Sequence, residues 1–285
     1  MNILVTGATG FVGKHLIGQL QKDNNVHLLV RPESNYIALG IKHVFIFKDN
    51  IEELTAYLNK ENIDGIIHLA SLYVAEHKSE QIKDLVLSNI YLGTAILEAS
   101  VKASVKWFLN TGTIWQNFNA PDESDEYNPV NLYAATKQAF ITMAKYYTET
   151  SNLRFCTLKL CDTYGPNDTR RKILSLFDEL AKTGQTLDMS LGEQKLDLLH
   201  IDDVVNGFII LANMLNNDSI HLDNEYVLTS GNPMTLREIA ALYEKNHHVK
   251  LSINWGGRPY RKREVMRPYQ GKKLPNWKMT VPLFK

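Results

Sequence analysis

The sequence predicts an α/β protein with a doubly wound, parallel Rossmann sheet and a smaller C-terminal α/β region. Three observations lead to this prediction. Short apolar segments alternate with amphipathic ones over the first half of the chain, a glycine-rich turn follows the first apolar segment, and the alternation changes after residue 162. Strands that alternate with helices pair in parallel through right-handed crossovers, so helices are expected on both faces of the sheet.

The first region, residues 1–162, holds the regular alternation. Runs of branched and aromatic residues between polar turns predict strands at 2–6, 25–30, 43–47, 64–69, 105–109 and 154–160. Apolar residues at helical spacing predict helices at 12–22, 51–60, 84–102 and 132–150.

The second region, residues 163–285, begins at a Gly165-Pro166 turn. Thr235 with Glu238 three residues later has the pattern of a capping box at a helix start. Because no low-complexity linker divides the chain, we expect the two regions to pack together around a cleft, with elements that can interleave. The region's pattern predicts helices at 173–183, 203–213 and 236–246, strands at 198–201 and 225–228, and a basic, irregular tail from Trp255.

The composition points to a soluble cytoplasmic protein. Of the 285 residues, 44% are hydrophobic, enough for a packed core, and the formal net charge is zero, which favours neither nucleic acid nor an anionic membrane as a partner. The two cysteines, Cys156 and Cys161, fit no disulfide or metal-ligand spacing, so no metal site is expected. The N-terminal apolar run is too short for a signal peptide, and no apolar stretch is expected to span a membrane.

A glycine turn of Gly7, Gly10 and Gly13 links the first strand to the first helix. Glycine lets a backbone approach a pyrophosphate closely, and a helix N-terminus offers it free N–H groups. The spacing Gly-x-x-Gly-x-x-Gly differs from the usual Gly-x-Gly-x-x-Gly fingerprint, and an ordinary strand–helix turn is the alternative. In this context we interpret the turn as a dinucleotide site.

Arg31 ends the second strand, where a protein that prefers NAD carries an acid for the ribose 2′-hydroxyl. A guanidinium there suits a 2′-phosphate, so NADP(H) is favoured over NAD(H). Glu33 remains able to take the acidic role, and Arg31 can be an ordinary surface residue. Asp49 follows the third strand and is expected either to bond the adenine amino group or to cap a helix.

Tyr133 and Lys137 are four residues apart and so share one helix face. The Lys137 ammonium is expected to lower the pKa of Tyr133, so that Tyr133 gives a proton to a carbonyl oxygen as a hydride reaches the carbon. Lys137 can also bond the nicotinamide ribose. Thr111, at the end of the fifth strand, is the best placed hydroxyl to hold the same oxygen. A solvated helix face is the alternative for the pair, and the glycine turn argues against it.

Together these residues resemble the extended short-chain dehydrogenase/reductase family of nucleotide-sugar epimerases, dehydratases and 4-ketoreductases. The resemblance covers nearly the whole chain. It implies a Rossmann domain, a small C-terminal substrate domain and a nucleotide-diphosphate sugar in the cleft. The motifs that carry it are residues 6–13, 68–71, Asn89, Thr111, Tyr133 with Lys137, 164–166 and 200–203.

The resemblance also implies roles for single residues. Thr111, Tyr133 and Lys137 form a catalytic triad, and Arg261 grips the diphosphate of the substrate. The residues implied to bind the cofactor, besides Arg31, are Gly7, Thr9, Gly10, Phe11 and Val12 at the pyrophosphate, Asp49 and Asn50 at the adenine, Leu69, Ala70 and Ser71 at the nicotinamide, and Asn89, Tyr133 and Lys137.

Several positions depart from the family pattern. Gly112 and Thr113 follow Thr111 where the 4,6-dehydratases carry an Asp-Glu pair, so dehydration has no acid and base. Asp162 replaces an asparagine of the epimerases and Leu196 an arginine, so the substrate phosphates must be held differently. The residues expected to bind substrate are Tyr73, Thr113, Asp162, Arg170, Lys172 and Arg261, with Trp115 as a second aromatic candidate. A solvated helix start is the alternative for residues 170–172.

The acid before the Tyr-Gly turn and the Gly192-Glu-Gln segment look most like the reductases that complete CDP-3,6-dideoxyhexoses, the abequose and paratose synthases. This resemblance implies NADPH-dependent reduction of the 4-keto group of a nucleotide-diphosphate 6-deoxy- or 3,6-dideoxyhexose, for surface polysaccharide. The alternatives are a 4-epimerase that retains NAD and a non-catalytic dinucleotide sensor. A sensor would not need Tyr133 and Lys137.

The two long helices predicted at 84–102 and 132–150 carry apolar residues on more than one face, among them Ile141, Met143 and Tyr146. A helix with this pattern is usually covered on more than one side. The family resemblance implies that both helices pair with their twofold copies in a homodimer. Cover by the chain's own C-terminal part is the alternative.

Overall fold

The computed structural model describes residues 1–124 and 126–284. A seven-stranded sheet lies at its centre, and every strand pair in it is parallel. Its strands are β1 (Asn2–Thr6), β2 (Asn25–Val30), β3 (His43–Ile46), β4 (Gly65–His68), β5 (Trp107–Thr113), β6 (Arg154–Leu160) and β11 (Glu225–Leu228). They lie in the order β11-β6-β5-β4-β1-β2-β3, and the predicted parallel Rossmann sheet is confirmed.

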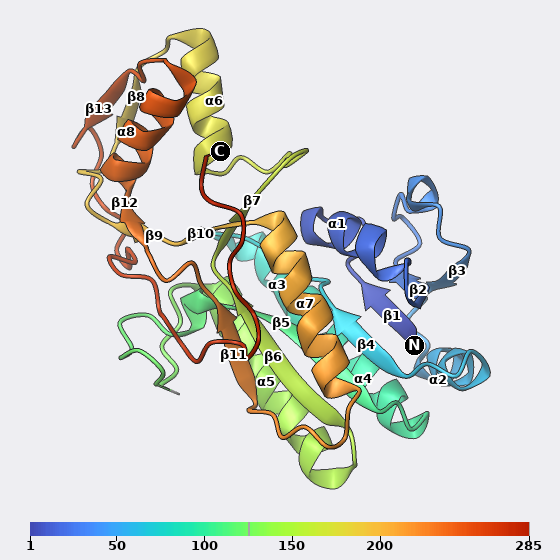
Figure 1. Ribbon diagram of the computed structural model, residues 1–285. Helices are drawn as coiled ribbons and strands as arrows, with labels where there is room; N and C mark the ends of the chain where they lie inside the picture. The colour runs from blue at the N-terminus through green and yellow to red at the C-terminus, as the bar shows by residue number, and fades with distance from the viewer. Residues whose placement is uncertain (125, 285) are drawn as a thin grey trace.

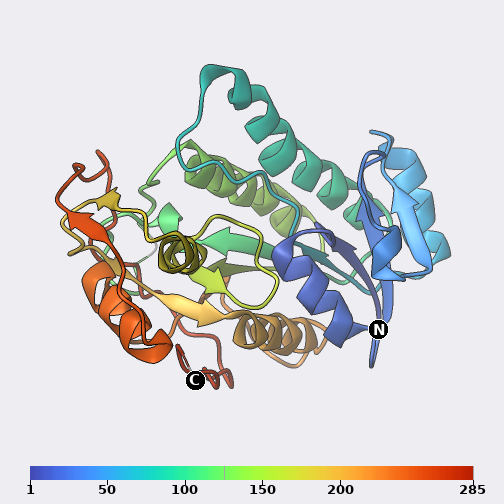
Figure 2. The same ribbon diagram turned by 90° about the horizontal axis from the view of Figure 1, so that it is seen from above.

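Helices cover both faces of the sheet, as Figures 1 and 2 show. They are α1 (Phe11–Leu20), α2 (Ile51–Lys60), α3 (Ile82–Val86), α4 (Leu92–Lys102), α5 (Leu132–Thr150), α6 (Ile173–Thr183), α7 (Ile201–Leu215) and α8 (Leu236–His247). One apolar cluster packs the sheet against α1 and α7, and a second packs it against α2, α4 and α5. Successive strand residues face opposite sides, so Leu109 joins the first cluster and Phe108 the second.

Two elements from beyond residue 162 belong to this sandwich. β11 pairs with β6 at the sheet edge, and α7 lies beside α1 on one face. The rest of the C-terminal region has its own apolar cluster around Phe177, Ile239 and Tyr243, between α6 and α8 at the upper left of Figure 1. The two regions are therefore interleaved. The short strands are β7 (Asp162–Tyr164), β8 (Leu187–Met189), β9 (Lys195–Leu196), β10 (Leu198–His200), β12 (Met234–Thr235) and β13 (Ile253–Trp255).

The caps of two C-terminal helices can be compared with the sequence prediction. α7 begins at Ile201 rather than at Asp203, because the His200 ring accepts a hydrogen bond from the Asp202 N–H and caps the helix there. The predicted capping box is confirmed: the Thr235 hydroxyl accepts from the Glu238 N–H, and the Glu238 carboxylate accepts from the Thr235 N–H.

The helix expected at 84–102 starts earlier, as a 3₁₀ turn at Ser79–Gln81, and contains a π-helical turn at Leu87–Tyr91. The whole run Ser79–Lys102 is long and apolar enough to cross a membrane by length and composition alone. This finding corrects the expectation that no stretch of the chain reaches that length. The inner face of this run packs on the sheet, where Ile96, Leu97 and Ala99 are buried. The core helix of a soluble protein meets the same criteria.

Candidate active site

The glycine turn after β1 is packed closely against neighbouring backbone. Gly7 has a φ of +69°, and a Cβ there would lie 2.6 Å from the Ala70 nitrogen. A Cβ on Gly13 would lie 2.4 Å from the Gly7 oxygen. Gly10 precedes α1 without capping it through a side chain, so the first N–H groups of the helix are free to bind an anion.

A cavity of about 240 Å³ opens in front of this turn. It brings together residues from three separate segments of the chain that the sequence assigned to one cofactor. Predicted residues among its lining are Gly7, Thr9, Gly10, Arg31, Leu69, Ala70 and Ser71. Phe11 and Val12 form the first turn of the adjoining helix α1.

Arg31 lies at the rim of the cavity and is paired with Glu33, with 3.0 Å between Nε and the carboxylate oxygen. Both side chains are about two-thirds exposed, 65% and 63%. An exposed pair of this kind holds its partners only weakly. The arginine is therefore able to turn toward an anion without a large loss of stability.

Asp49 and Asn50 lie outside this cavity lining, and their side chains are engaged elsewhere. The Asn50 side-chain oxygen accepts from the N–H groups of Glu52 and Glu53 and caps α2. Asp49 has a φ of +61° and accepts a 2.5 Å hydrogen bond from the Tyr91 hydroxyl. Asn50, not Asp49, is thus the helix cap, and the adenine contacts stay a prediction.

Asn89 occupies the π-helical turn and is buried. Its side-chain oxygen accepts from the Ser71 hydroxyl and the Leu72 N–H, and its amide donates to the Leu72 oxygen and to Thr136. It is absent from the cavity lining. Asn89 therefore positions the segment that carries Ser71, and also ties that segment to α5. π-helical turns often mark functional sites.

A second buried polar pair supports the same segment. The Thr6 hydroxyl accepts from the Ala70 N–H at 3.1 Å and bonds the His68 ring at 2.9 Å. Burial, followed by the nearby Lys137 charge, lowers the pKa of His68 to about 3, so His68 is a neutral packed histidine. The structure adds Thr6 to the residues that shape the site. The strand-end position of Thr6 was the signal in the sequence.

Tyr133 and Lys137 lie on α5, as predicted, but their pKa values follow burial. Burial raises the pKa of Tyr133 to about 12, against a hydrogen bond with Ser71 that favours the phenolate. Burial lowers the pKa of Lys137 to about 8. The expectation that the ammonium would bring the Tyr133 pKa toward neutrality is thus wrong for the protein alone, because burial raises that pKa and the Lys137 ammonium makes no hydrogen bond with the phenol.

Lys137 is almost fully buried, and its Nζ has no hydrogen-bond partner among the described residues. The Thr111 hydroxyl, at the end of β5, shares this property. Buried donors without partners are rare and call for a ligand. Thr113 differs, since its hydroxyl accepts from the Trp115 N–H and caps a short 3₁₀ turn, Ile114–Gln116, and it lies outside the cavity linings.

These features fit a nicotinamide dinucleotide. The uncapped start of α1 offers N–H groups to a pyrophosphate, Arg31 stands at the cavity rim, and the Lys137 ammonium would bond ribose hydroxyls. Such a cofactor supplies or accepts a hydride when it is bound.

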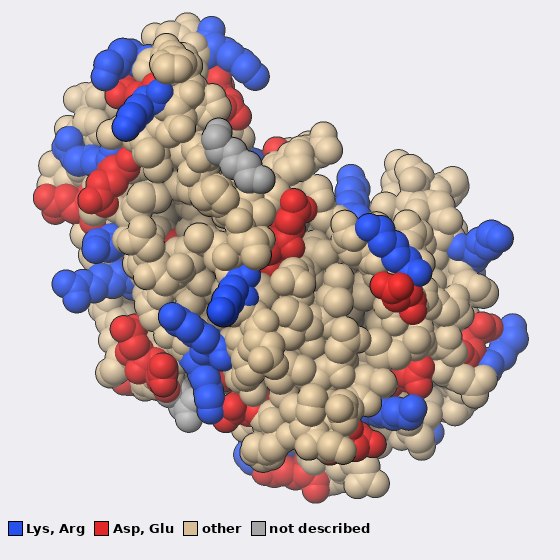
Figure 3. Space-filling model, viewed as in Figure 1, with Lys and Arg blue, Asp and Glu red and all other residues tan. Residues whose placement is uncertain are grey.

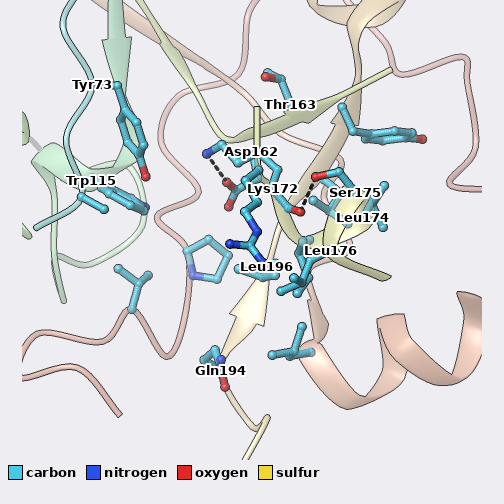
Figure 4. A pocket seen from close by; sticks show the side chains of 18 of the residues that line it. Tyr73, Trp115, Asp162, Thr163, Lys172, Leu174, Ser175, Leu176, Gln194 and Leu196 are labelled. Atoms are coloured by element: carbon cyan, nitrogen blue, oxygen red, sulfur yellow. Dashed lines mark hydrogen bonds and ion pairs between the residues drawn. The ribbon is translucent and has the colours of Figure 1, made fainter. Parts of the chain in front are cut away.

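A larger cavity of about 920 Å³ lies between the sheet and the C-terminal region. Figure 4 shows Tyr73 and Trp115 on one side of it and Asp162 and Lys172 facing them. The two aromatic rings are 5.7 Å apart, the Lys172 ammonium lies 4.8 Å from the centre of the Tyr73 ring, and it pairs with Asp162 at 3.3 Å. Predicted substrate residues from three segments thus meet here. The Asp162 charge is offset by Lys172.

Cations outnumber acids along this cavity. Arg261 lines it as predicted and pairs with Glu76 at 3.1 Å. The full set of lysines and arginines is Arg171, Lys172, Lys195, Arg258, Arg261, Lys262 and Arg263, against the acids Glu76, Asp162, Asp168, Asp178 and Glu264. On the face in Figure 3 the two charge types are interspersed rather than segregated. The basic tail was the sequence signal for the cations that residue-by-residue reasoning missed.

Arg170, like Thr113, was predicted to bind substrate and is absent from the cavity lining. Its guanidinium donates to the Asp168 carboxylate and to Thr163, and it stacks 4.1 Å from the centre of the Phe11 ring. The arginine thus joins the loop after β7 to the start of α1. Its positive charge is paired with the neighbouring Asp168 instead of with a substrate phosphate.

Asn131 was not singled out in the sequence. Its side-chain oxygen caps α5 by accepting from the Ala134 N–H, its amide donates to the Ala75 oxygen, and it lines the larger cavity. It therefore fixes the start of the helix that carries Tyr133. An asparagine immediately before a helix was the available signal.

Comparisons with known proteins show which family the chain resembles. A family model described as the NAD dependent epimerase/dehydratase family matches residues 3–223. CDP-abequose synthase of Salmonella muenchen is 29% identical over 269 residues, which cover 93% of this chain and 87% of that protein. CDP-abequose synthase of Yersinia pseudotuberculosis is 28% identical and covers 94% and 92%.

Solved structures share the fold at lower identity. UDP-glucose 4-epimerase of Thermotoga maritima, with UDP-glucose, superposes with a TM-score of 0.82 at 19% identity over 99% of this chain and 94% of that one. A dTDP-glucose 4,6-dehydratase of Streptomyces venezuelae, with NAD bound, has a TM-score of 0.82 at 21% identity over 99% and 93%. The match of the family model over most of the chain is the stronger finding. The chain belongs to the NAD dependent epimerase/dehydratase family, within the extended short-chain dehydrogenases/reductases, and is an NAD(P)-dependent enzyme of that group.

Proposed function

We propose that the protein uses NADPH to reduce the 4-keto group of a nucleotide-diphosphate 6-deoxy- or 3,6-dideoxyhexose. We further propose that it works in the cytoplasm, in deoxysugar synthesis for a surface polysaccharide. The observation that carries the proposal is the place of Tyr133, whose ring meets Tyr73 of the larger cavity and whose hydroxyl is hydrogen-bonded to Ser71 of the smaller one. The nearly full-length similarity to CDP-abequose synthases supports the same class of sugar.

The chemistry asked of the chain is simple. A reductase needs a group that starts protonated and gives its proton to the carbonyl oxygen, and a phenol with a pKa near 12 starts in that state. Lys137 holds the ribose and stabilises the phenolate once the proton has left. Thr111, or Thr113 two residues on along the same face of β5, holds the carbonyl oxygen. Tyr73 and Trp115 face the sugar, and the cavity cations hold the diphosphate.

A 4-epimerase that retains NAD is the second candidate, because UDP-glucose 4-epimerase shares the fold over the whole chain. It would use the same tyrosine and lysine. Its first step removes a proton from an alcohol, so it needs Tyr133 as phenolate. An epimerase would keep its NAD through the whole cycle, whereas a reductase must exchange its oxidised cofactor for NADPH.

The test offers the purified enzyme NADPH with CDP-, UDP- and dTDP-linked 4-keto-6-deoxyhexoses, and with a CDP-linked 4-keto-3,6-dideoxyhexose. We expect one NADPH to be oxidised for each 4-keto sugar reduced. We also expect the enzyme to be purified without cofactor and to bind NADPH reversibly. Tightly retained NAD, together with interconversion of 4-hydroxyl epimers and no net NADPH use, would instead establish the epimerase.

We also propose a homodimer. Its face comprises Ile82, Val86, Leu87 and Tyr91 on the long helical run and Met143 and Tyr146 on α5, all exposed in the single chain. The two helical segments are neighbours on one side of the sheet, as Figure 2 shows for α4 and α5. Exposed apolar side chains gathered on neighbouring helices favour a contact surface, and a twofold copy would cover it with the same residues.

A further inference from the structure

A cluster of two histidines and a glutamate lies on β2, β3 and the end of α2, and none of its residues lines either cavity. His27 is the third residue of β2, His43 is the first of β3, and the parallel register sets them side by side. Glu61 follows directly on α2. These are the beginnings of the strands, whereas Gly7 and Arg31 follow their ends. The cluster therefore belongs to neither cavity.

The three side chains converge. One ligand-type atom from each lies within 4.8 Å of the others. The imidazole rings are 4.6 Å apart between centres, and the His43 Nδ1 lies 4.0 Å from a Glu61 carboxylate oxygen. His27 is fully buried, whereas the His43 side chain is 46% exposed. One fixed ligand and two adjustable ones thus share a small volume.

Hydrogen bonds determine which His27 nitrogen is free to coordinate. The Asn2 amide donates to the main-chain oxygens of Glu61 and Asn62, so its own oxygen faces Asn25 and accepts from the Asn25 amide. That same Asn25 amide lies 3.1 Å from His27 Nε2. An amide NH₂ only donates, so Nε2 must carry the lone pair.

The His27 proton then sits on Nδ1, 2.9 Å from the Tyr57 hydroxyl. A histidine whose second nitrogen donates to an oxygen has its ring and tautomer fixed in the form that binds metals. The amide now bonded to Nε2 belongs to an exposed residue, Asn25, which can move aside.

We propose that His27, His43 and Glu61 bind one divalent transition-metal ion of the Zn²⁺ type. Two imidazoles and a carboxylate are donors that Zn²⁺ accepts, with a water as the fourth ligand. Ligand atoms about 2.0–2.2 Å from a tetrahedral ion lie about 3.3 Å from one another. Rotation of the exposed His43 and the half-buried Glu61 closes the present spacing. The ion ties β2 and the edge strand β3 to the end of α2.

No step of the proposed reduction passes through this site. The proposal is therefore tested by measuring Zn²⁺ binding and the thermal stability of the protein. Cys156 and Cys161 are both buried, and burial raises the pKa of each thiol, so neither competes for the ion. The test uses tag-free protein freed of metal with a chelator and then dialysed. Zn²⁺ is added in a calorimetric titration, and the midpoint of thermal unfolding is followed with and without it.

We expect one Zn²⁺ per chain, a higher unfolding midpoint with Zn²⁺, and no effect of Mg²⁺, which prefers oxygen ligands. Tyr57→Phe removes the partner of Nδ1 but keeps the ring, and should weaken binding about tenfold. His43→Gln and Glu61→Gln should weaken it further. His221→Gln, an exposed histidine outside the cluster, is the matched control and should change nothing.

The proposal is overturned if the wild-type chain binds no Zn²⁺, or if His43→Gln and Glu61→Gln bind it as the wild type does. Equal weakening by His221→Gln would also overturn it, because the ion would then be held by scattered surface histidines. If His43→Gln does not fold, Glu61→Gln and Tyr57→Phe carry the same comparison, since each leaves the histidine pair intact.

Discussion

The ring of Tyr73 meets the ring of Tyr133 edge to face, with 5.1 Å between their centres. Tyr73 lines the larger cavity and lies beneath the Lys172 ammonium. Tyr133 is hydrogen-bonded to Ser71, which lines the smaller cavity. The proposed proton donor therefore stands where the proposed substrate and cofactor sites meet, which is where a proton must be delivered beside a hydride.

Tyr133→Phe should lower turnover by roughly 10²–10⁴-fold, because it removes a positioned acid without removing the ring. NADPH affinity, measured by fluorescence titration, should be nearly unchanged. Tyr127→Phe, at an exposed tyrosine that lines neither cavity, is the control and should retain full activity. A parallel loss of cofactor affinity in Tyr133→Phe would mean that Tyr133 is structural.

Lys137→Met should stabilise the cofactor-free protein while abolishing activity. Burial lowers the pKa of Lys137 from 10.5 to about 8, and this shift corresponds to about 3 kcal/mol against folding while the side chain is charged. A base with a lowered folded pKa destabilises fully below that pKa, and the cost fades as pH rises toward the unfolded value.

Thermal unfolding of both proteins at several pH values checks the sign. The advantage of Lys137→Met should be largest below about pH 8 and should shrink between about pH 8 and pH 10.5. An advantage that is constant with pH would arise from packing rather than from the buried charge. Lys137→Met being less stable throughout would show that the ammonium has a partner in solution.

Arg31→Asp should shift the ratio of NADP to NAD affinities toward NAD, because it replaces a partner of the 2′-phosphate with one for the ribose hydroxyl. Glu33→Gln is the matched change on the other side of the ion pair. It frees Arg31 and should favour NADP modestly. An unchanged ratio in Arg31→Asp would mean that Arg31 does not read the ribose.

Thr111→Val and Thr113→Val separate two hydroxyls that lie on one face of β5. The Thr111 hydroxyl is buried and without a partner among residues 1–124 and 126–284, so its loss should lower turnover and leave stability nearly unchanged. Thr113→Val removes a cap and should cost about 1 kcal/mol of stability. Turnover of both variants, with unfolding midpoints, decides the role. If Thr111→Val were fully active and Thr113→Val folded but inactive, Thr113 rather than Thr111 would hold the carbonyl oxygen.

The homodimer predicts a mass by light scattering of twice the single-chain 32.5 kDa at micromolar concentration. Met143→Glu with Tyr146→Glu places charge on the proposed face, where the two side chains are 44% and 65% exposed. We expect this double variant to be monomeric. Ile37→Glu, at an equally apolar position 82% exposed elsewhere, should remain dimeric. A single-chain mass for the wild type would refute the dimer.

The amino-acid sequence by itself determined the parallel sheet, because strand and helix periodicities are local and a parallel pair of strands requires a crossover. It also determined the glycine turn and the one-face pairing of Tyr133 with Lys137, since each depends on residues fewer than seven positions apart. These local patterns were enough to recognise the family.

Only the tertiary structure decided what depends on burial and on contacts between distant segments. Arg170 turned from the substrate to Asp168 and Phe11, Asn50 rather than Asp49 became the cap, and the Tyr133 pKa rose instead of falling. His27, His43 and Glu61 are far apart in the chain and meet through strand register. Desolvation and register are properties of the packed chain, so no sequence spacing could have revealed them.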